Sequence, residues 1–322
     1  NFQGIGDEGL AQLAPDLATA PVVELFLVKN GITDLGLACL ADALKRNRSL
    51  TTLHLSDNKF TDQGLELLCA SLADTPLRTL NLCQNPVGEA AGRLMGEWLL
   101  KPTCKLEALL LGGASPPKES FVGGGSESAS SKQSPVPRLG AEGMACLAAG
   151  LMAPHGCSLR KLWVVNHEIG TGGVRAAAAA LFCNESLTEL NLSQNTIKPG
   201  DQRVILTAAM ANTFLKSLTC KSSGLPEAME RELEAAARTR PKITLDDAIG
   251  AGRRETAVAG LAATCRQEVL AAARKRGLVF QKALVPRPAV AVAVIRRTAV
   301  PLEMSEEPIW ARQEATGAWS DA

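Results

Sequence analysis

One pattern recurs along the chain and constrains its fold more than any other feature. The segments "VVELFLVKNGI", "LTTLHLSDNKF", "LRTLNLCQNPV" and "LTELNLSQNTI" all fit L-x-x-L-x-L-x-x-N-x-L, with other apolar residues at some leucine positions. The first three asparagines, Asn30, Asn58 and Asn85, are 28 and 27 residues apart. A period of this length accommodates one short strand and one full helix in each unit.

The helical half of each unit repeats as well. "ITDLGLACLADAL" from Ile32 aligns with "FTDQGLELLCASL" from Phe60 and with "IGDEGLAQLAPDL" from Ile5. Together the two halves resemble the leucine-rich repeat of the ribonuclease-inhibitor type, over residues 1–245. The resemblance implies an α/β solenoid, with parallel strands lining a concave face and helices outside. A helical and extended C-terminal tail is predicted to follow it. The resemblance also implies a structural ladder of turn asparagines: Asn30, Asn58, Asn85 and Asn195.

Three units depart from this ladder. Ala114, His167 and Ser223 stand at the asparagine position, so we expect their turns to be held less firmly. Residues 115–138, rich in Ser, Gly and Pro, interrupt one unit and are predicted to form a flexible insertion loop. Phosphorylation of its serines is the alternative, regulatory interpretation.

The first helical segment carries a motif typical of nucleotide-binding loops. Gly4, Gly6 and Gly9 spell G-x-G-x-x-G, but "NFQ" before them supplies no strand to deliver the loop to a phosphate. Glycine recurs at the same place in later units, as Gly36 and Gly64. The motif therefore belongs to the repeat.

Beyond the repeats the chain changes character. After "KITL", predicted to be a last strand, residues 246–277 contain an amphipathic helix with Val258, Leu261, Ala262, Cys265 and Val269 on one face. We expect this helix to cap the open end of the solenoid. Residues 278–322 are predicted to be an extended arm that binds a partner. The residues expected to make that contact are Val290, Val292, Val294, Arg296, Arg297, Trp310 and Trp319.

The residues between the strand leucines point to the concave face, because side chains alternate along a strand. The predicted central column of that face is Phe26, His54, Asn81, Leu110, Trp163, Asn191 and Thr219. This column is mildly apolar and nearly uncharged, and exposed aromatic groups are typical of protein-binding surfaces. The alternative is that these are ordinary scattered surface residues.

Composition excludes several classes of function. The net charge is +1 and there is no tyrosine, which disfavours a generally basic nucleic-acid binder. The nine cysteines include no C-x-x-C pair and indicate buried thiols in a reducing, cytoplasmic compartment, with an organelle as the alternative. His54 and Cys83 would share the concave face, but no third group orients the histidine. We therefore expect no catalysis, metal, cofactor, small-molecule substrate or membrane insertion.

The leading hypothesis is a non-catalytic protein–protein interaction scaffold, a structural subunit of a larger assembly such as a cytoskeletal or ciliary complex. One alternative is regulation of a small GTPase, because Ran GTPase-activating proteins are built from the same type of repeat, although the rim turns here lack their arginine. Another is an accessory subunit that binds RNA or an acidic protein surface, since ten basic residues lie between Arg253 and Arg297. Inhibition of a basic ribonuclease is disfavoured by the near-neutral concave face.

Overall fold

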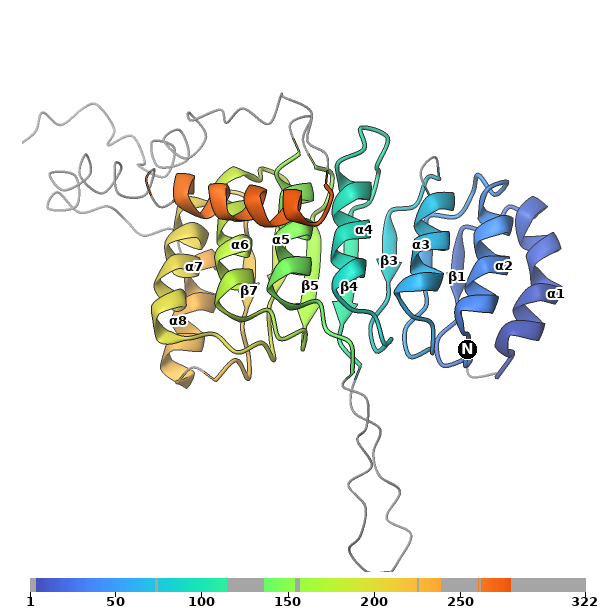
Figure 1. Cartoon of the computed structure of the whole chain (residues 1–322), viewed down its shortest axis with the longest axis horizontal. Coiled ribbons are helices and arrows are strands. Elements are labelled where there is room, and N and C mark those ends of the chain that lie inside the picture. Colours follow the sequence, from blue (N-terminus) through green and yellow to red (C-terminus); the bar gives the residue numbers. More distant parts are fainter. Residues whose placement is uncertain are drawn as a thin grey trace, which may run out of the picture.

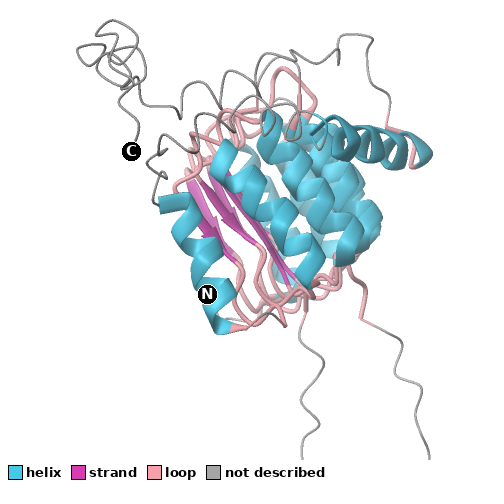
Figure 2. Ribbon diagram, turned by 90° about the vertical axis from the view of Figure 1, so that its left-hand side faces the viewer, coloured by secondary structure: helices cyan, strands magenta, loops and turns pink. Residues whose placement is uncertain are grey.

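The computed structural model describes residues 4–72, 75–114, 136–153, 157–224, 226–238, 260 and 262–278. Within them, strands and helices alternate along the chain and form two layers, a curved sheet and a row of helices (Figures 1 and 2). The strands are β1 (Glu24–Phe26), β2 (Thr52–His54), β3 (Thr79–Asn81), β4 (Ala108–Gly112), β5 (Lys161–Val165), β6 (Glu189–Asn191) and β7 (Ser217–Thr219). The helices are α1 (Gly6–Thr19), α2 (Asp34–Leu44), α3 (Asp62–Ser71), α4 (Glu89–Leu99), α5 (Gly140–Leu151), α6 (Gly170–Cys183), α7 (Pro199–Ala211) and α8 (Glu227–Arg238). The predicted α/β solenoid is confirmed.

The sheet keeps one register from end to end. All seven strands pair in parallel and in sequence order, so that each unit contacts the units before and after it. Phe26 pairs with His54, His54 with Asn81, and Asn81 with Leu110. Leu110 pairs with Trp163, which pairs with Asn191, and Asn191 pairs with Thr219. The predicted central column is therefore one continuous row across the sheet.

The leucines on either side of that row form the core. Leu53, Leu80 and Leu109 are fully buried between the sheet and the helices, as are Leu55 and Leu82 one step further along their strands. Burying a leucine side chain contributes about 1.5–3 kcal/mol relative to leaving it in water. A single unit cannot shield its leucines from water on all sides. The units stacked before and after it supply the missing contacts.

Buried asparagines tie successive units together. Asn58 Oδ1 accepts hydrogen bonds from the backbone N–H groups of Asn30 (3.0 Å) and Ile32 (3.1 Å). Its Nδ2 donates to the carbonyl oxygens of Leu27 and Leu55, both at 2.8 Å. Asn85 and Asn195 repeat this arrangement in their own turns. One side chain thus satisfies backbone groups of two adjacent units that are shielded from water.

A second ladder links the helix starts. Thr33 and Thr61 cap α2 and α3, and each donates its backbone N–H and hydroxyl to the aspartate of the preceding unit, Asp7 and Asp34 respectively. A Cβ added at Gly36 would lie 2.3 Å from Asp7 Oδ1. The recurrent glycine at this position therefore leaves room for the aspartate of the preceding unit.

Three further asparagines, which the repeat pattern did not predict, lie behind the helices. Asn47, Asn184 and Asn212 are buried after α2, α6 and α7. Each donates its amide to carbonyl groups of the preceding unit and accepts two backbone N–H groups at the start of the next strand segment. Their sequence signal is an asparagine two or three residues before the next leucine segment.

The units that lack a ladder asparagine have substitutes, contrary to the expectation that their turns are poorly held. Arg138 donates from one Nη1 to the carbonyl oxygens of Ala114 (3.0 Å) and Asn166 (2.8 Å). His167 is fully buried, and its Nδ1 accepts the Leu139 N–H at 3.2 Å. Glu230 Oε1 accepts the N–H and hydroxyl of Ser223.

A helix at residues 262–275, here called the strap, lies crosswise over the outer side of the helix layer (Figure 1). Ala262, Cys265 and Val269 of its predicted apolar face are buried. We expected this helix to cap the open end of the solenoid, and instead it contacts α5 and α6. The last repeat is followed by α8, which already packs beside β7.

Several expectations concern residues outside the described ranges. These are most of the insertion loop (115–135), the "KITL" strand, Val258 and Leu261 of the tail helix, and the arm from residue 279 onward.

We predict that Asn58→Ala lowers the free energy of unfolding by about 1–3 kcal/mol, because buried backbone groups of two units lose their partner. Chemical denaturation measures this difference. Ala114→Asn is the control and should be nearly neutral, since Arg138 already holds that turn. Equal losses at both positions would show that the ladder does not hold the turns.

We also predict that His167 makes stability depend on pH. Burial, with a smaller effect of the nearby Arg138 charge, lowers the pKa of His167 from 6.5 to about 4. Between these values the unfolded chain binds a proton that the folded chain does not, so stability should fall by about 3 kcal/mol as pH drops from 6.5 to 4. In His167→Asn this part of the loss should disappear in denaturation curves, whereas His54→Asn should retain it.

Candidate functional site

The concave face, defined by the central column Phe26 to Thr219, carries an aromatic pair at its N-terminal end. The Phe26 and His54 rings stack with centroids 4.7 Å apart and planes 24° apart. Asn81 Nδ2 lies 3.3 Å from His54 Nδ1, and Asn81 Oδ1 accepts the Cys83 N–H at 3.0 Å, which fixes the amide. Partial burial lowers the pKa of His54, so the stack is neutral at pH 7. Phe26 is nevertheless 42% exposed.

A second aromatic group lies three strands further along. Trp163 on β5 donates its indole N–H to Glu189 Oε1 at 2.7 Å. Lys161 Nζ lies 3.0 Å from Glu189 Oε2 and 4.8 Å from the centroid of the Trp163 ring. The indole is therefore held in one orientation and its polar atom is satisfied, while the ring remains partly exposed.

The surface between the two aromatic groups is small and uncharged. Leu110 is half-buried in the middle of the column, and a Cβ at Gly112 would lie only 3.1 Å from Cys83 Sγ. Asn191, beyond Trp163, has its Oδ1 occupied by the Ser193 N–H at 3.0 Å. The concave face thus presents two aromatic anchors in fixed orientations, with an uncharged surface between them.

The arrangement does not support nucleophilic chemistry. Burial raises the pKa of the Cys83 thiol to about 11, so the thiol is protonated at neutral pH. His54 Nδ1 faces the Asn81 amide. Across the described residues no group of three or more His, Cys, Asp or Glu side chains is placed to hold a metal ion.

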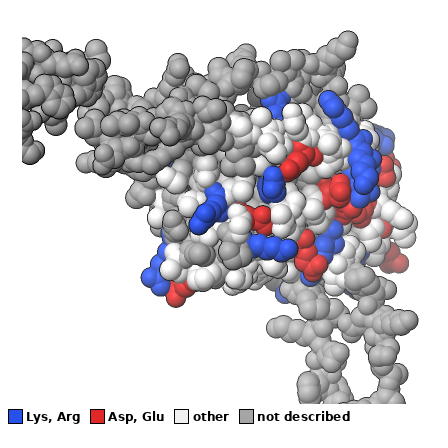
Figure 3. All heavy atoms as spheres, turned by 60° about the vertical axis from the view of Figure 1, so that its left-hand side comes forward, with Lys and Arg blue, Asp and Glu red and all other residues white. Residues whose placement is uncertain are grey.

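Charged side chains of both signs lie on the described surface. Figure 3 shows basic and acidic side chains interspersed on the side it presents. Arg138, at the C-terminal end of the insertion in the sequence, uses its guanidinium to hold two backbone carbonyl groups, and its side chain is only 15% exposed. It is therefore unsuited to reach into a GTPase.

Among the described helices, none is long and apolar enough to cross a membrane. This result concerns those residues alone.

Repeat length, parallel sheet and buried asparagines together define the class: the chain is a leucine-rich repeat protein. Its repeats are of the ribonuclease-inhibitor type. The sequence matches the Leucine Rich repeat family at residues 46–69 and 183–200.

Similar curated proteins belong to two groups. The chain is 28% identical to pig (Sus scrofa) ribonuclease inhibitor over 262 residues, which cover 70% of this chain and 57% of the inhibitor. Against the mouse (Mus musculus) ribonuclease inhibitor it is 27% identical, covering 71% and 58%. Against human (Homo sapiens) NACHT, LRR and PYD domains-containing protein 2 it is 27% identical, covering 69% and 24%. The chain thus spans a little over half the length of the inhibitors it matches.

The structure brings the predicted concave residues together in one row, and it adds an ion pair beside that row. Lys161 and Glu189 flank the row, and the register places them directly opposite each other on β5 and β6. The signal for this pair was the strand alignment itself, in which opposite charges fall at equivalent positions. The predicted contact residues of the arm lie outside the described residues.

Proposed function

We propose that the chain is a non-catalytic protein-binding scaffold whose concave face docks a partner protein on two aromatic anchors, the Phe26–His54 stack and Trp163. The observation that carries the proposal is the fixed, partly exposed indole of Trp163, bonded to Glu189 and flanked by Lys161. A side chain already held in its bound orientation loses little conformational entropy on binding. Aromatic groups of this kind dominate the energy of protein interfaces.

The chemistry of the face also indicates the kind of contact. Lys161 and Glu189 neutralise each other at 3.0 Å, and the floor between the anchors is uncharged. A partner would therefore bind chiefly through apolar and aromatic contact, and binding would persist at high salt because screening acts on charges. A strongly basic partner would gain little from this face.

We further propose that residues 279–322 provide a second binding element, which would make the chain a subunit of a larger assembly. The support comes from sequence: paired Arg296 and Arg297 follow an alternating Val–Ala segment, and Trp310 and Trp319 lie beyond. Strand addition and extended-peptide docking use such segments.

The anchor prediction is that Phe26→Ala and Trp163→Ala each weaken capture of concave-face partners about 30-fold, the size typical of a dominant interface residue. Quantitative affinity purification at low and high salt measures this change. Leu35→Ala is the matched control, because Leu35 is 74% exposed on the helix side and should have no effect. If both anchor variants retain every partner, the concave face does not carry the function.

The arm prediction uses a truncation after Leu278, which keeps that buried side chain in place. The truncated chain should keep the circular-dichroism spectrum and melting temperature of the full chain. It should lose the partners that Phe26→Ala retains. A truncated chain that unfolds would place the arm in the core, and one that keeps all partners would assign binding to the concave face alone.

A further inference from the structure

The asparagine ladder is interrupted at two successive units. Ala114, after β4, and His167, after β5, stand at the ladder position, so these two units lack the asparagine that links neighbours elsewhere. Arg138 and His167 satisfy the local carbonyl and N–H groups. Neither repeats the four-bond connection that Asn58 makes. A repeat array stays cooperative only while each interface between neighbours is strong. Here β4 and β5 pair over five residues, and contacts in the helix layer join the same units.

The helix layer supplies part of that support. A Cβ added at Gly92 of α4 would lie 2.2 Å from the Gly143 carbonyl oxygen of α5, and one at Gly96 would lie 2.3 Å from the Cys146 carbonyl oxygen. These glycines let the two backbones touch, and α4 and α5 are the most closely packed helix pair in the described chain. The unit that contains the insertion is therefore joined to the preceding unit on the helix side.

The strap crosses the same place. Arg276, directly after the strap, lies 2.8 Å from Glu89 at the start of α4 and 3.7 Å from Glu142 in the first turn of α5. Glu268 makes a two-bonded ion pair with Arg175 of α6, at 2.9 Å for each bond. The strap and Arg276 thus connect three consecutive units, the middle one of which contains the insertion.

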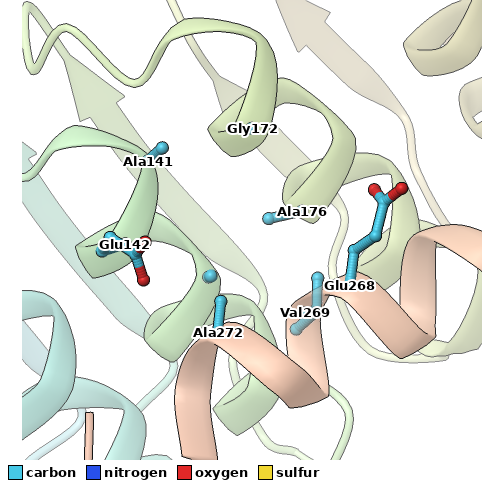
Figure 4. A pocket seen from close by; sticks show the side chains of 8 residues that line it. Ala141, Glu142, Gly172, Ala176, Glu268, Val269 and Ala272 are labelled. Carbon is cyan, nitrogen blue, oxygen red and sulfur yellow. The ribbon is translucent and has the colours of Figure 1, made fainter. Parts of the chain in front are cut away.

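The surface under the strap is shaped to receive it. Ala141, Ala145, Gly172 and Ala176 form a seat of small side chains on α5 and α6, and Val269 and Ala272 of the strap face it (Figure 4). Ala145 and Ala176 are buried, whereas Leu67, at the position of α3 equivalent to Ala176, is 50% exposed. A cleft of about 130 Å³ remains under the strap, so the contact is not completely filled.

We propose that the strap is a brace across the interrupted repeat, which keeps β4 and β5 in register and so holds Leu110 and Trp163 in one continuous binding face. This inference rests on the proposed function for its biological consequence. Its physical part stands alone, because the register of β4 and β5 can be measured without a partner.

The test uses the full chain and hydrogen exchange. In Val269→Asp, which places a charge in the seat, the Gly113 amide, bonded to the Val165 carbonyl oxygen at 2.8 Å, should exchange at least tenfold faster. The Leu55 amide, bonded to the Asn81 carbonyl oxygen at 2.8 Å away from the strap, should keep its wild-type rate. Unchanged exchange at Gly113, or equal acceleration at both amides, would overturn the brace.

Reversal of the Arg175–Glu268 ion pair controls for misfolding of Val269→Asp. Glu268→Arg should accelerate Gly113 exchange by opposing Arg175, and the double variant Arg175→Glu with Glu268→Arg should restore the wild-type rate. Failure of the double variant to restore protection would also overturn the proposal. Partner capture by the same variants separates the two proposals: restored protection with no concave-face binding would leave the brace intact and refute the docking function.

Discussion

The structure depends on the stacking of identical backbone turns, and the buried asparagine is the group that makes this stacking specific. Leucine burial is non-directional and would tolerate many relative positions of two units. The Asn58 amide and carbonyl, by contrast, contact four backbone groups from two units, and each would be left unpaired by a shift. An unpaired buried group costs about 1–3 kcal/mol, so one side chain fixes the register that the leucines stabilise. The continuous row from Phe26 to Thr219 is a consequence of that register.

The elements that sequence predicted well are those set by neighbouring units. The strands, the burial of their leucines and the order of the central column follow from a period that appears several times, and the structure confirms them. Asn47, Asn184 and Asn212 were missed because their positions fall outside the leucine pattern and recur in only some units. Arg138 could not be assigned to the ladder either, since its partner Ala114 lies 24 residues away across the insertion.

The strap shows a different limit of prediction. The periodicity of its apolar residues shows that one face is buried, but it cannot say against which surface. The apolar face with Cys265 and Val269 would be buried in an end cap and equally in a crosswise contact. What decides between them is the small-residue seat and ion pairs between residues 93 and 187 positions apart, Arg175 with Glu268 and Glu89 with Arg276. Alanine on a helix surface is common enough that Ala145 and Ala176 gave no separate signal.

Contacts in the helix layer also affect the strands that form the concave face. Strands and helices of one unit share a rigid core, so a constraint on α5 and α6 is also a constraint on β4 and β5, which carry Leu110 and Trp163. An indole held at 2.7 Å from a carboxylate on the next strand keeps its orientation only while those two strands keep their register. The ladder provides that register between β5 and β6 through Asn195, whereas between β4 and β5 the asparagine is absent. The binding face crosses this position, where the ladder asparagine is absent. The helix layer behind the sheet, with its glycine contacts and the strap, therefore helps to keep that face continuous.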